Sequence, residues 1–419
     1  MDYIKLYSSI IKKNMGKPYL TRRLINLGLN IGYKYVSYFP DKRFPKSLRF
    51  LNKICFKNII LPLKYPQNAA WVNIFAPTEI LLAMDIHPLF VEGFSSFMSG
   101  LFIEDALIDI TEYQGISNTL CSYHKTFLGA IIHDIVPKPR FLITTSMICD
   151  ANISTFRYIS KLKNVPLYII DIPNEYSPEA IDYVKKQIIE MIEFVEDNTH
   201  KKLNIEILKE VIRRENKTRK LMNNYINSLA QKCLPTTMTF EMYMLFATHV
   251  FVGAEETLLF YEMLLDDIKK SPYRSKKGIF FVHLLPIFED NFKYYLNLDG
   301  EFDLLGCDLN YDFLDTMDEQ NPIDAIAKKL VLNIYNGSFE RKIEHIVNLI
   351  QRIKPDGVVQ FCHLGCKQSI GGAILLKERL NELNFPFTTI DGDALDKRNN
   401  QTGQIKTRLE AFFEILRSR

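Results

Sequence analysis

The chain has 419 residues, which is enough for two or three domains with a buried core. Hydrophobic residues make up 47% and charged residues 24%, so the composition excludes a collagen, a coiled coil or a disordered protein as the overall description. Seven scattered cysteines are too few for a disulfide scaffold. The longest apolar run, 242–254, falls short of the ~20 residues of a membrane helix, and the start of the chain lacks a signal-peptide pattern. We expect a cytoplasmic protein with reduced thiols and no membrane contact.

The net charge of +3 conceals an asymmetry along the chain. Residues 1–65 hold 14 Lys and Arg against two acids, a net of +12, whereas the remainder holds 38 against 47, a net of −9. Aromatic and aliphatic residues alternate with the basic ones, which predicts a folded helical arm at 1–65. Such an arm is expected to dock on the acidic body of this chain or on a sister subunit. Nucleic acid is the alternative, and it is not expected because no binding motif accompanies the charge.

The rest of the chain alternates short β-rich runs with amphipathic helices, as parallel α/β proteins do. The pattern predicts a strand at 141–145, a helix at 153–163 and a strand at 166–171. Ser177-Pro178 then fits an N-cap with proline at the first helical position. A mostly helical stretch covers about 203–270.

The C-terminal third repeats this layout. The pattern predicts strands at 357–361 and 386–391 and helices at 372–383 and 404–416. We therefore predict a basic arm at 1–65, a first α/β domain at 66–235, a helical connector at 236–275 and a second α/β domain at 276–419. In both α/β halves a cysteine loop follows one strand and an aspartate ends the next, which suggests a structural duplication.

Four cysteines lie where parallel-sheet proteins place their ligands, at the carboxyl ends of strands or the start of helices. Cys149 follows the 141–145 strand, and Cys362 and Cys366 follow the 357–361 strand. Cys121 precedes an apolar helical run. A helix N-terminus is expected to lower a thiol pKa. Inert packed thiols remain the alternative for each one alone. Zinc is disfavoured because no Cys-x2-Cys pair exists, while an iron–sulfur cluster accepts ligands scattered along the chain.

Other chemistries have no matching motif. The sequence contains no G-x4-G-K-[ST] phosphate loop, no G-x-G-x-x-G after a strand, no G-x-S-x-G and no H-E-x-x-H. We therefore do not expect the chain to hydrolyse ATP. The acid–base candidates are His124 and His363, and the alternative is that each hydrogen-bonds a cysteine loop. Lys367, Lys397 and Arg398 are candidates for contact with phosphates, with solvated surface charge as the alternative.

Several segments, kept in order from about 66 to 419, resemble the 2-hydroxyacyl-CoA dehydratase family, which includes the benzoyl-CoA reductase iron–sulfur subunits. The segments are 77–88, 121–123, 149–150, 171–173, 216–219, 356–368, 391–393 and 404–412. The resemblance implies two flavodoxin-like domains that hold one [4Fe–4S] cluster through Cys121, Cys149 and Cys366. Cys362 is a second candidate for the last ligand. The family commonly has proline after the first of these cysteines, and this chain has Ser122, so it departs from the pattern there.

The resemblance also implies a reaction. Three cysteines on four irons leave one iron with an open position that polarises the thioester carbonyl of an acyl-CoA substrate. A separate ATP-dependent activator supplies one electron, and the resulting ketyl radical anion expels the neighbouring hydroxyl to give the enoyl-CoA. A homologous second subunit is expected. The alternatives are a low-potential reductase subunit, a non-catalytic electron-relay or structural subunit, and a metal-free binding protein.

Overall fold

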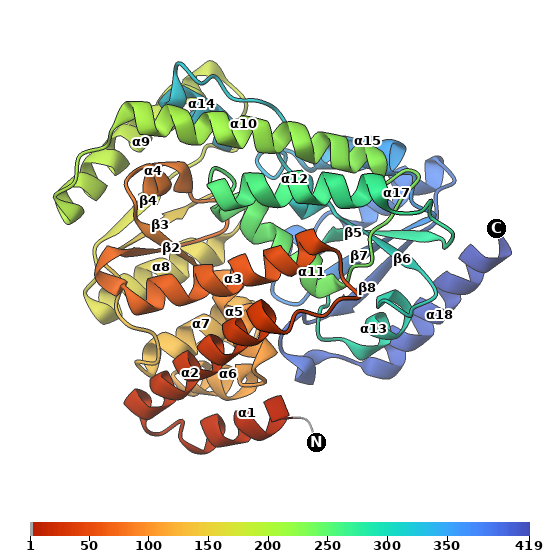
Figure 1. Cartoon of the computed structure of the whole chain (residues 1–419), viewed down its shortest axis with the longest axis horizontal. Coiled ribbons are helices and arrows are strands. Elements are labelled where there is room, and N and C mark those ends of the chain that lie inside the picture. The colour runs from red at the N-terminus through yellow and green to blue at the C-terminus, as the bar shows by residue number, and fades with distance from the viewer. Residues whose placement is uncertain (1–2) are drawn as a thin grey trace.

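The computed structural model describes residues 3–419 as two parallel β-sheets surrounded by helices (Figure 1). The first sheet has the order β2-β1-β3-β4 and is built from β1 (Ala69–Val72), β2 (His87–Phe90), β3 (Phe141–Thr145) and β4 (Leu167–Ile170). The second has the order β6-β5-β7-β8 and is built from β5 (Gly278–His283), β6 (Asp303–Cys307), β7 (Gly357–His363) and β8 (Phe387–Gly392). The two orders correspond strand for strand. The predicted α/β fold with two parallel sheets is confirmed.

The central strands are buried along their whole length, as parallel sheets with helices on both faces require. Every residue of β3 and of β7 is buried, which explains why these runs show no alternation of polar and apolar residues. In register, Ile143 pairs with Val72 and with Tyr168, and Val359 pairs with Phe281 and with Thr388. Both sheets therefore direct the carboxyl ends of their strands toward loops that carry cysteine.

The first sheet is covered by helices that follow its strands in the chain. They are α4 (Thr78–Ala83), α5 (Val91–Gly100), α6 (Glu104–Tyr113), α7 (Ser122–Ile132), α8 (Asp150–Lys163) and α9 (Pro178–Thr199). The predicted N-cap of α9 is confirmed, since the Ala180 amide donates a 3.0 Å hydrogen bond to the Ser177 hydroxyl.

The second sheet is covered by α13 (Asp290–Leu296), α15 (Phe339–Ile353), α16 (Lys367–Ile370), α17 (Ala373–Glu382) and α18 (Thr402–Ser418). The remaining helix of this half, α14 (Pro322–Leu332), packs instead on α9 and contacts α10. The predicted apolar side of the last helix is confirmed, because Leu409, Phe412 and Phe413 are all buried. Short 3-10 turns complete the architecture at η1 (Pro66–Asn68), η3 (Asp308–Tyr311) and η4 (Lys397–Asn399).

Three long helical segments connect the two sheets. They are α10 (Ile205–Ser228), α11 (Met238–Leu245), which continues into a π-helical turn η2 (Phe246–Val250), and α12 (Glu255–Lys270). In Figure 1, α10 and α12 run side by side across the top of both halves, and they contact each other. A buried ion cluster joins the halves here, because the Lys329 ammonium on α14 contacts the carboxylates of Glu79 on α4 and Glu215 on α10. The exact domain boundaries remain a prediction.

The basic arm folds as predicted into helices, namely α1 (Tyr3–Lys13), α2 (Pro18–Tyr38) and α3 (Lys46–Lys64). Lys57 of α3 pairs with Glu256 at 2.5 Å, and Lys12 of α1 pairs with Asp105 at 2.7 Å. The arm therefore docks on the acidic body of its own chain. α3 lies across the front of the molecule in Figure 1 and contacts β2, α11 and α12.

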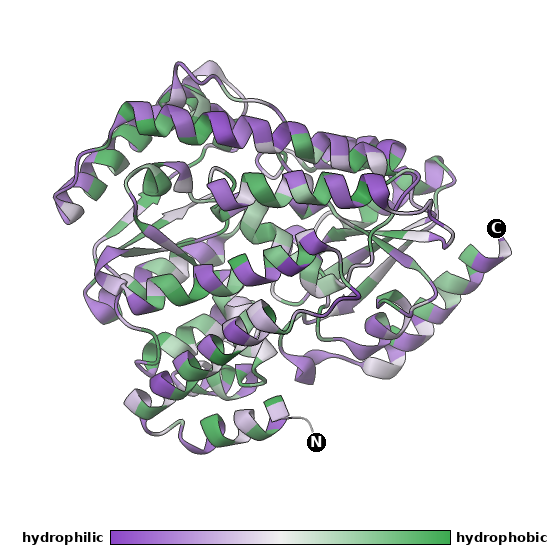
Figure 2. Ribbon diagram, in the orientation of Figure 1, coloured by the Kyte–Doolittle hydropathy of each residue, from purple (hydrophilic) through white to green (hydrophobic). Residues whose placement is uncertain are grey.

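Hydrophobic and hydrophilic residues alternate along the outer helices, most visibly along α10 (Figure 2). The hydrophobic residues of α10 that face inward, such as Leu208, Val211 and Ile212, are fully buried. Among the helices of residues 3–419, none combines the length and the apolar character of a membrane span.

Candidate functional site

Three cysteines each stand at the N-cap of a helix. Cys149 lies between β3 and α8, Cys366 lies between β7 and α16, and Cys121 begins α7. The first two positions are equivalent in the two sheets, because β3 and β7 occupy the same place in the strand order. Both loops leave the carboxyl edge of their sheet, where open parallel sheets bind ligands.

The loop before Cys366 lies directly against the backbone of Cys121. Gly365 has a φ of +80°, and a Cβ at this position would stand 2.7 Å from the Cys121 amide nitrogen and 2.7 Å from the Thr119 carbonyl oxygen. Only glycine fits this left-handed conformation in this space. The close approach brings a cysteine of the second sheet to a cysteine of the first.

Each of the three thiols has a histidine beside it. The Cys121 sulfur lies 3.2 Å from His363 Nε2, and the Cys366 sulfur lies 3.2 Å from His283 Nε2. The Cys149 sulfur lies 3.9 Å from His124 Nε2. The structure thus places both acid–base candidates, His124 and His363, at the cysteines.

The proton of His363 can be assigned from its other contact. Its Nδ1 accepts a 3.1 Å hydrogen bond from the Ala394 amide, and burial lowers the pKa of the ring. A neutral imidazole whose Nδ1 accepts must carry its proton on Nε2. His363 therefore donates to the Cys121 sulfur, which matches the alternative role as a residue that hydrogen-bonds a cysteine loop.

Ser122, the residue that departs from the family pattern, ties the start of α7 to the second sheet. Its hydroxyl donates a 2.5 Å hydrogen bond to Asp393 Oδ1, just after β8. Asp393 also accepts from the amides of Leu395 and Asp396. The loop that follows β8 therefore fixes the position of Cys121.

Two residues beside the cysteines have a strained backbone. Ile148 precedes Cys149 with a φ of +69°, and His283, at the end of β5, has a φ of +72°. A β-branched residue in the left-handed region is a genuine outlier. Strain of this kind persists only where the surrounding structure imposes it, and it concentrates at functional sites.

The expectation of lowered thiol pKa values is wrong for two of the three. Burial, followed by the charges of Cys366 and Cys149, raises the pKa of Cys121 well above its usual value. Burial, followed by the charge of Cys366, raises the pKa of Cys149 to about 12. The helix N-terminus is outweighed because these thiols are removed from water and lie near one another.

Cys362 makes different contacts from this group, although the charge of Cys366 also acts on it. Side chains alternate along a strand, so Cys362 and His363 on β7 point to opposite faces. The Cys362 thiol lies 3.7 Å from the Ser369 carbonyl oxygen, and burial, then the charge of Asp391, raises its pKa to about 11. Its contacts therefore differ from those of the three thiols with histidine neighbours.

Two residues of this site were not identified from the sequence. One is His283, which follows the apolar run Ile279-Phe280-Phe281-Val282 of β5. The other is Glu92 in the first turn of α5, whose charge acts on Cys149 and whose Oε2 is buried without a hydrogen-bond partner. Burial raises the pKa of Glu92 to about 8. The only local signal was a polar residue at or just beyond the carboxyl end of a buried strand, and it does not reveal the contact with a cysteine.

The three cysteines fit an iron–sulfur cluster by their chemistry. Thiolates are the ligands of such clusters, and a bound metal deprotonates thiols that otherwise resist ionisation. Several buried polar atoms around them have no hydrogen-bond partner, namely Tyr123 Oη, His124 Nδ1 and His283 Nδ1. Within residues 3–419, no three His, Cys, Asp or Glu side chains converge on one point as a single ion requires. A cluster does not need this convergence, because its ligands bind different irons.

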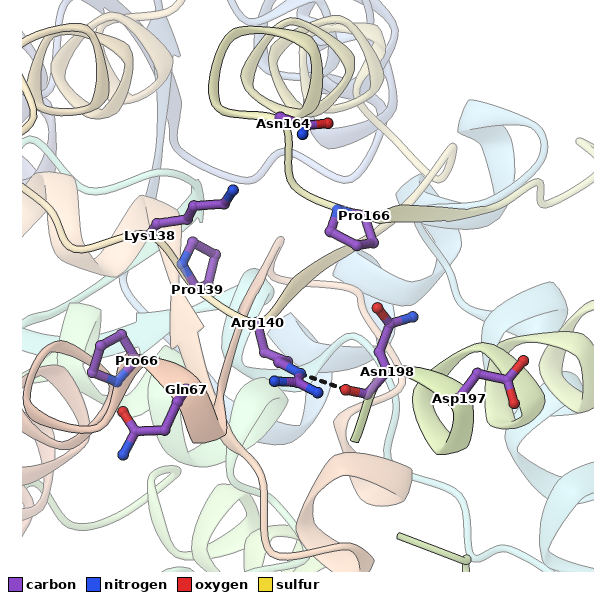
Figure 3. A pocket seen from close by; sticks show the side chains of 9 residues that line it. All are labelled: Pro66, Gln67, Lys138, Pro139, Arg140, Asn164, Pro166, Asp197 and Asn198. Atoms are coloured by element: carbon purple, nitrogen blue, oxygen red, sulfur yellow. Dashed lines mark hydrogen bonds between the residues drawn. The ribbon is translucent and has the colours of Figure 1, made fainter. Parts of the chain in front are cut away.

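A surface pocket of about 540 Å³ lies at the opposite edge of the first sheet (Figure 3). Arg140 and Pro166, which line it, immediately precede β3 and β4, so the pocket opens at the amino ends of these strands. The Arg140 guanidinium donates to the Asn198 carbonyl across it. Because ligands of open parallel sheets bind at the carboxyl ends, this pocket is separate from the cysteine site.

The fold and the site define a two-sheet α/β protein with three thiols gathered between equivalent sheet edges, one of them buried and two partly exposed. The chain belongs to the family described as 2-hydroxyglutaryl-CoA dehydratase, D-component, whose model matches residues 73–416. The match contains all three cysteines and both sheets except β1, and it leaves the whole basic arm outside.

Three curated relatives are named as alpha subunits of hydroxyacyl-CoA dehydratases. The chain is 24% identical over 375 residues to the (R)-2-hydroxyisocaproyl-CoA dehydratase alpha subunit of Clostridioides difficile, covering 83% of this chain and 90% of the relative. It is 24% identical over 377 residues to the (R)-phenyllactyl-CoA dehydratase alpha subunit of Clostridium sporogenes, covering 84% and 90%. Subunit alpha of (R)-2-hydroxyglutaryl-CoA dehydratase of Acidaminococcus fermentans is 23% identical over 301 residues, covering 67% and 61%. Dehydratases are hydro-lyases, and an alpha subunit implies a partner subunit.

Proposed function

We propose that this chain is the [4Fe–4S] subunit of a 2-hydroxyacyl-CoA dehydratase-type enzyme, with Cys121, Cys149 and Cys366 as the cluster ligands. The observation that carries the proposal is the gathering of three mutually interacting thiols from both sheets, each beside a histidine. Family membership over residues 73–416 supports the reaction class. Cys362 is not a ligand in this proposal, because its thiol contacts Ser369 on the other face of β7.

A cluster bound here supplies one electron and a Lewis-acidic iron to a thioester carbonyl. The residues of the chain provide its surroundings. His363 donates an N–H to the Cys121 sulfur, and His283 Nε2 lies at the same distance from the Cys366 sulfur. Hydrogen bonds to cluster sulfurs tune the reduction potential. The Cys121 thiol and the three histidine rings are buried, which limits the access of water to reactive species on that side of the site.

Glu92 is the residue that we assign to proton transfer. Its carboxyl group lies near Cys149, one oxygen has no hydrogen-bond partner, and burial raises its pKa to about 8. A carboxyl group with this pKa exchanges a proton at neutral pH, which is what a general acid or base requires. His124 beside Cys149 is held neutral, because burial lowers its pKa to about 4.

Two further proteins belong to the proposal. The chain lacks a phosphate loop, so an ATP-dependent activator that delivers the electron must be a separate protein. The relatives are alpha subunits, and a homologous second subunit is therefore expected to complete the enzyme. The site is proposed to act in the cytoplasm, where the thiols stay reduced.

The cluster is tested by anaerobic reconstitution and electron paramagnetic resonance of the reduced chain. Cys121→Ser, Cys149→Ser and Cys366→Ser should each lose or alter the spectrum, whereas Cys362→Ser, the matched control on β7, should keep it. An unchanged spectrum in any of the first three variants removes that residue from the ligand set.

The reaction is tested with the chain, its partner subunit and the activator combined. Formation of an enoyl-CoA from a 2-hydroxyacyl-CoA, with no net electron consumption per turnover, supports a dehydratase. Consumption of electrons in proportion to product identifies a reductase instead. The Glu92→Gln variant should lose turnover while it retains the spectrum of the cluster.

A further inference from the structure

A crevice of about 260 Å³ opens beside the Cys366 loop, between the start of α15 and the turn that joins α16 to α17. Its lining includes Tyr335, Phe339, Lys342, Lys367, Gly371 and Leu375, and no acidic side chain lines it. We call it the Lys342 crevice. It is smaller than the roughly 300 Å³ or more typical of whole-ligand pockets, so it fits one group of a larger ligand.

Lys342 is a buried cation without a hydrogen-bond partner. Its side chain is 2% exposed, and its Nζ makes no hydrogen bond within residues 3–419. The nearest carboxylate oxygen, Asp308 Oδ2, lies 3.8 Å away and already accepts a 2.8 Å hydrogen bond from the Tyr335 hydroxyl. Burying an ammonium group without satisfying its donors is costly. Lys342 Nζ also lies over the rings of Tyr335 and Phe339, 4.5 and 5.4 Å from their centroids, but neither ring supplies an N–H acceptor as strong as an oxyanion. The N–H groups of Lys342 therefore remain available to an anion in the crevice.

The start of α17 reinforces this charge. The helix has ten residues, Gly372 is its N-cap, and no side chain caps it. A helix N-terminus presents free N–H groups and a partial positive charge to an anion. Gly371 is exposed, and Gly372 packs so closely on the Phe339 ring that a side chain there would collide with it. The exposed ammonium of Lys367, which lies 3.7 Å from Asp150 Oδ2, adds a second positive group at the rim.

The crevice adjoins the proposed active site through the chain itself. Lys367 and Gln368, which line it, directly follow Cys366. Burial lowers the pKa of Lys342, while the charges of Asp308 and then of Cys366 raise it, so the Lys342 amine and the Cys366 thiol are within electrostatic range. Arg398 and Lys397 do not line the crevice, since Arg398 pairs with Asp396 and Lys397 lies over the Phe102 ring.

We propose that the Lys342 crevice binds an anionic group of the acyl thioester substrate, either a phosphate of the coenzyme A moiety or a carboxylate of the acyl chain. The inference rests on the proposed function for the substrate class. It assigns to Lys342 and the start of α17 the role of holding the thioester in a fixed position beside Cys366. Both candidate groups are oxyanions that accept N–H hydrogen bonds, and they differ only in the part of the substrate that carries them.

The test is isothermal titration of the anaerobically purified chain with two probes. Coenzyme A carries phosphates without an acyl group, and the N-acetylcysteamine thioester of a 2-hydroxy dicarboxylic acid carries a carboxylate without phosphates. Lys342→Met should weaken binding of one probe by about ten- to a hundredfold, the usual value of a buried charge-assisted hydrogen bond. The probe that weakens identifies the source of the anion.

A second pair of variants tests the crevice independently, in case Lys342→Met does not fold. Leu375 lines the crevice in the first turn of α17 and is 41% exposed, so both glutamate and glutamine are accommodated there. Leu375→Glu should abolish binding by repulsion, whereas the neutral Leu375→Gln should retain most of it. Lys377→Gln, which removes an exposed charge from the same helix, should leave the affinity unchanged.

Equal affinity of Leu375→Glu and Leu375→Gln for both probes would overturn the proposal, and so would wild-type affinity in Lys342→Met. These outcomes are distinct from a failure of the proposed function. A chain that binds no iron yet loses coenzyme A affinity in Leu375→Glu keeps the anion site and refutes only the cluster. A chain that holds a cluster but shows no change in affinity refutes only the anion site.

Discussion

Substitution of Gly365 by alanine should separate the two sheets at the cysteine site. The residue has a φ of +80°, and the left-handed conformation costs a residue with a Cβ about 1–2 kcal/mol. The new Cβ would also press on the Cys121 amide and the Thr119 carbonyl at 2.7 Å, and both are backbone atoms. Overpacking of this kind costs about 1–3 kcal/mol more. We expect Gly365→Ala to lower the free energy of unfolding by about 2–5 kcal/mol.

Gly115→Ala is the matched control for backbone strain. Gly115 has a φ of +84°, but a Cβ there has no heavy atom within 4 Å. This variant should therefore lose only the conformational part, about 1–2 kcal/mol. Urea unfolding of both variants, performed anaerobically, measures the difference, and iron content after reconstitution shows whether Cys366 still reaches its partners. A difference below about 0.5 kcal/mol between the two variants, with iron retained in both, would refute the close approach on which the site depends.

Three further substitutions test the surroundings of the site. Burial raises the pKa of Glu241 from 4.5 to about 7, so the folded chain keeps a proton that the unfolded chain releases. The contribution of Glu241 to the free energy of unfolding therefore falls by about 3 kcal/mol as the pH rises from 4.5 to 7. The Glu241→Gln variant should lose that part of the pH dependence in urea unfolding. An unchanged slope of the free energy of unfolding against pH in Glu241→Gln would contradict this prediction. Lys329→Met leaves the buried carboxylates of Glu79 and Glu215 without this cation. Calorimetry should show that the free energy of unfolding falls by about 3–5 kcal/mol, and an unchanged stability would contradict this prediction. Ser177→Ala removes the cap of α9 and should lower the free energy of unfolding by about 1 kcal/mol in the same measurement, and an unchanged value would contradict this role.

Much of the fold was predictable because its signals are local. The β-rich runs that become β3, β4, β7 and β8 show up in the sequence as short apolar segments, and Ser177-Pro178 marks the start of α9 directly. The equivalence of the two halves was predictable from the spacing of their cysteine loops. Its proof is the common strand order, which only the pairing of distant strands reveals.

The missing parts of the site depend on contacts between distant residues. His283 lies 83 residues before Cys366, and no local pattern indicates that their side chains meet. Glu92 resembles an ordinary first-turn acid of α5 until its burial is known. The thiol pKa values were mispredicted for the same reason, since a helix N-terminus is visible in the sequence whereas burial and neighbouring thiols are not.

The central claim is that Cys121, Cys149 and Cys366 together hold one cluster, and its most direct test is the iron and acid-labile sulfide content of the chain after anaerobic reconstitution. We expect about four iron and four sulfide per chain in the wild type and in Cys362→Ser, and a marked loss in the triple serine variant of the other three cysteines. Wild-type protein without iron, or a triple variant with full iron and sulfide, would contradict it.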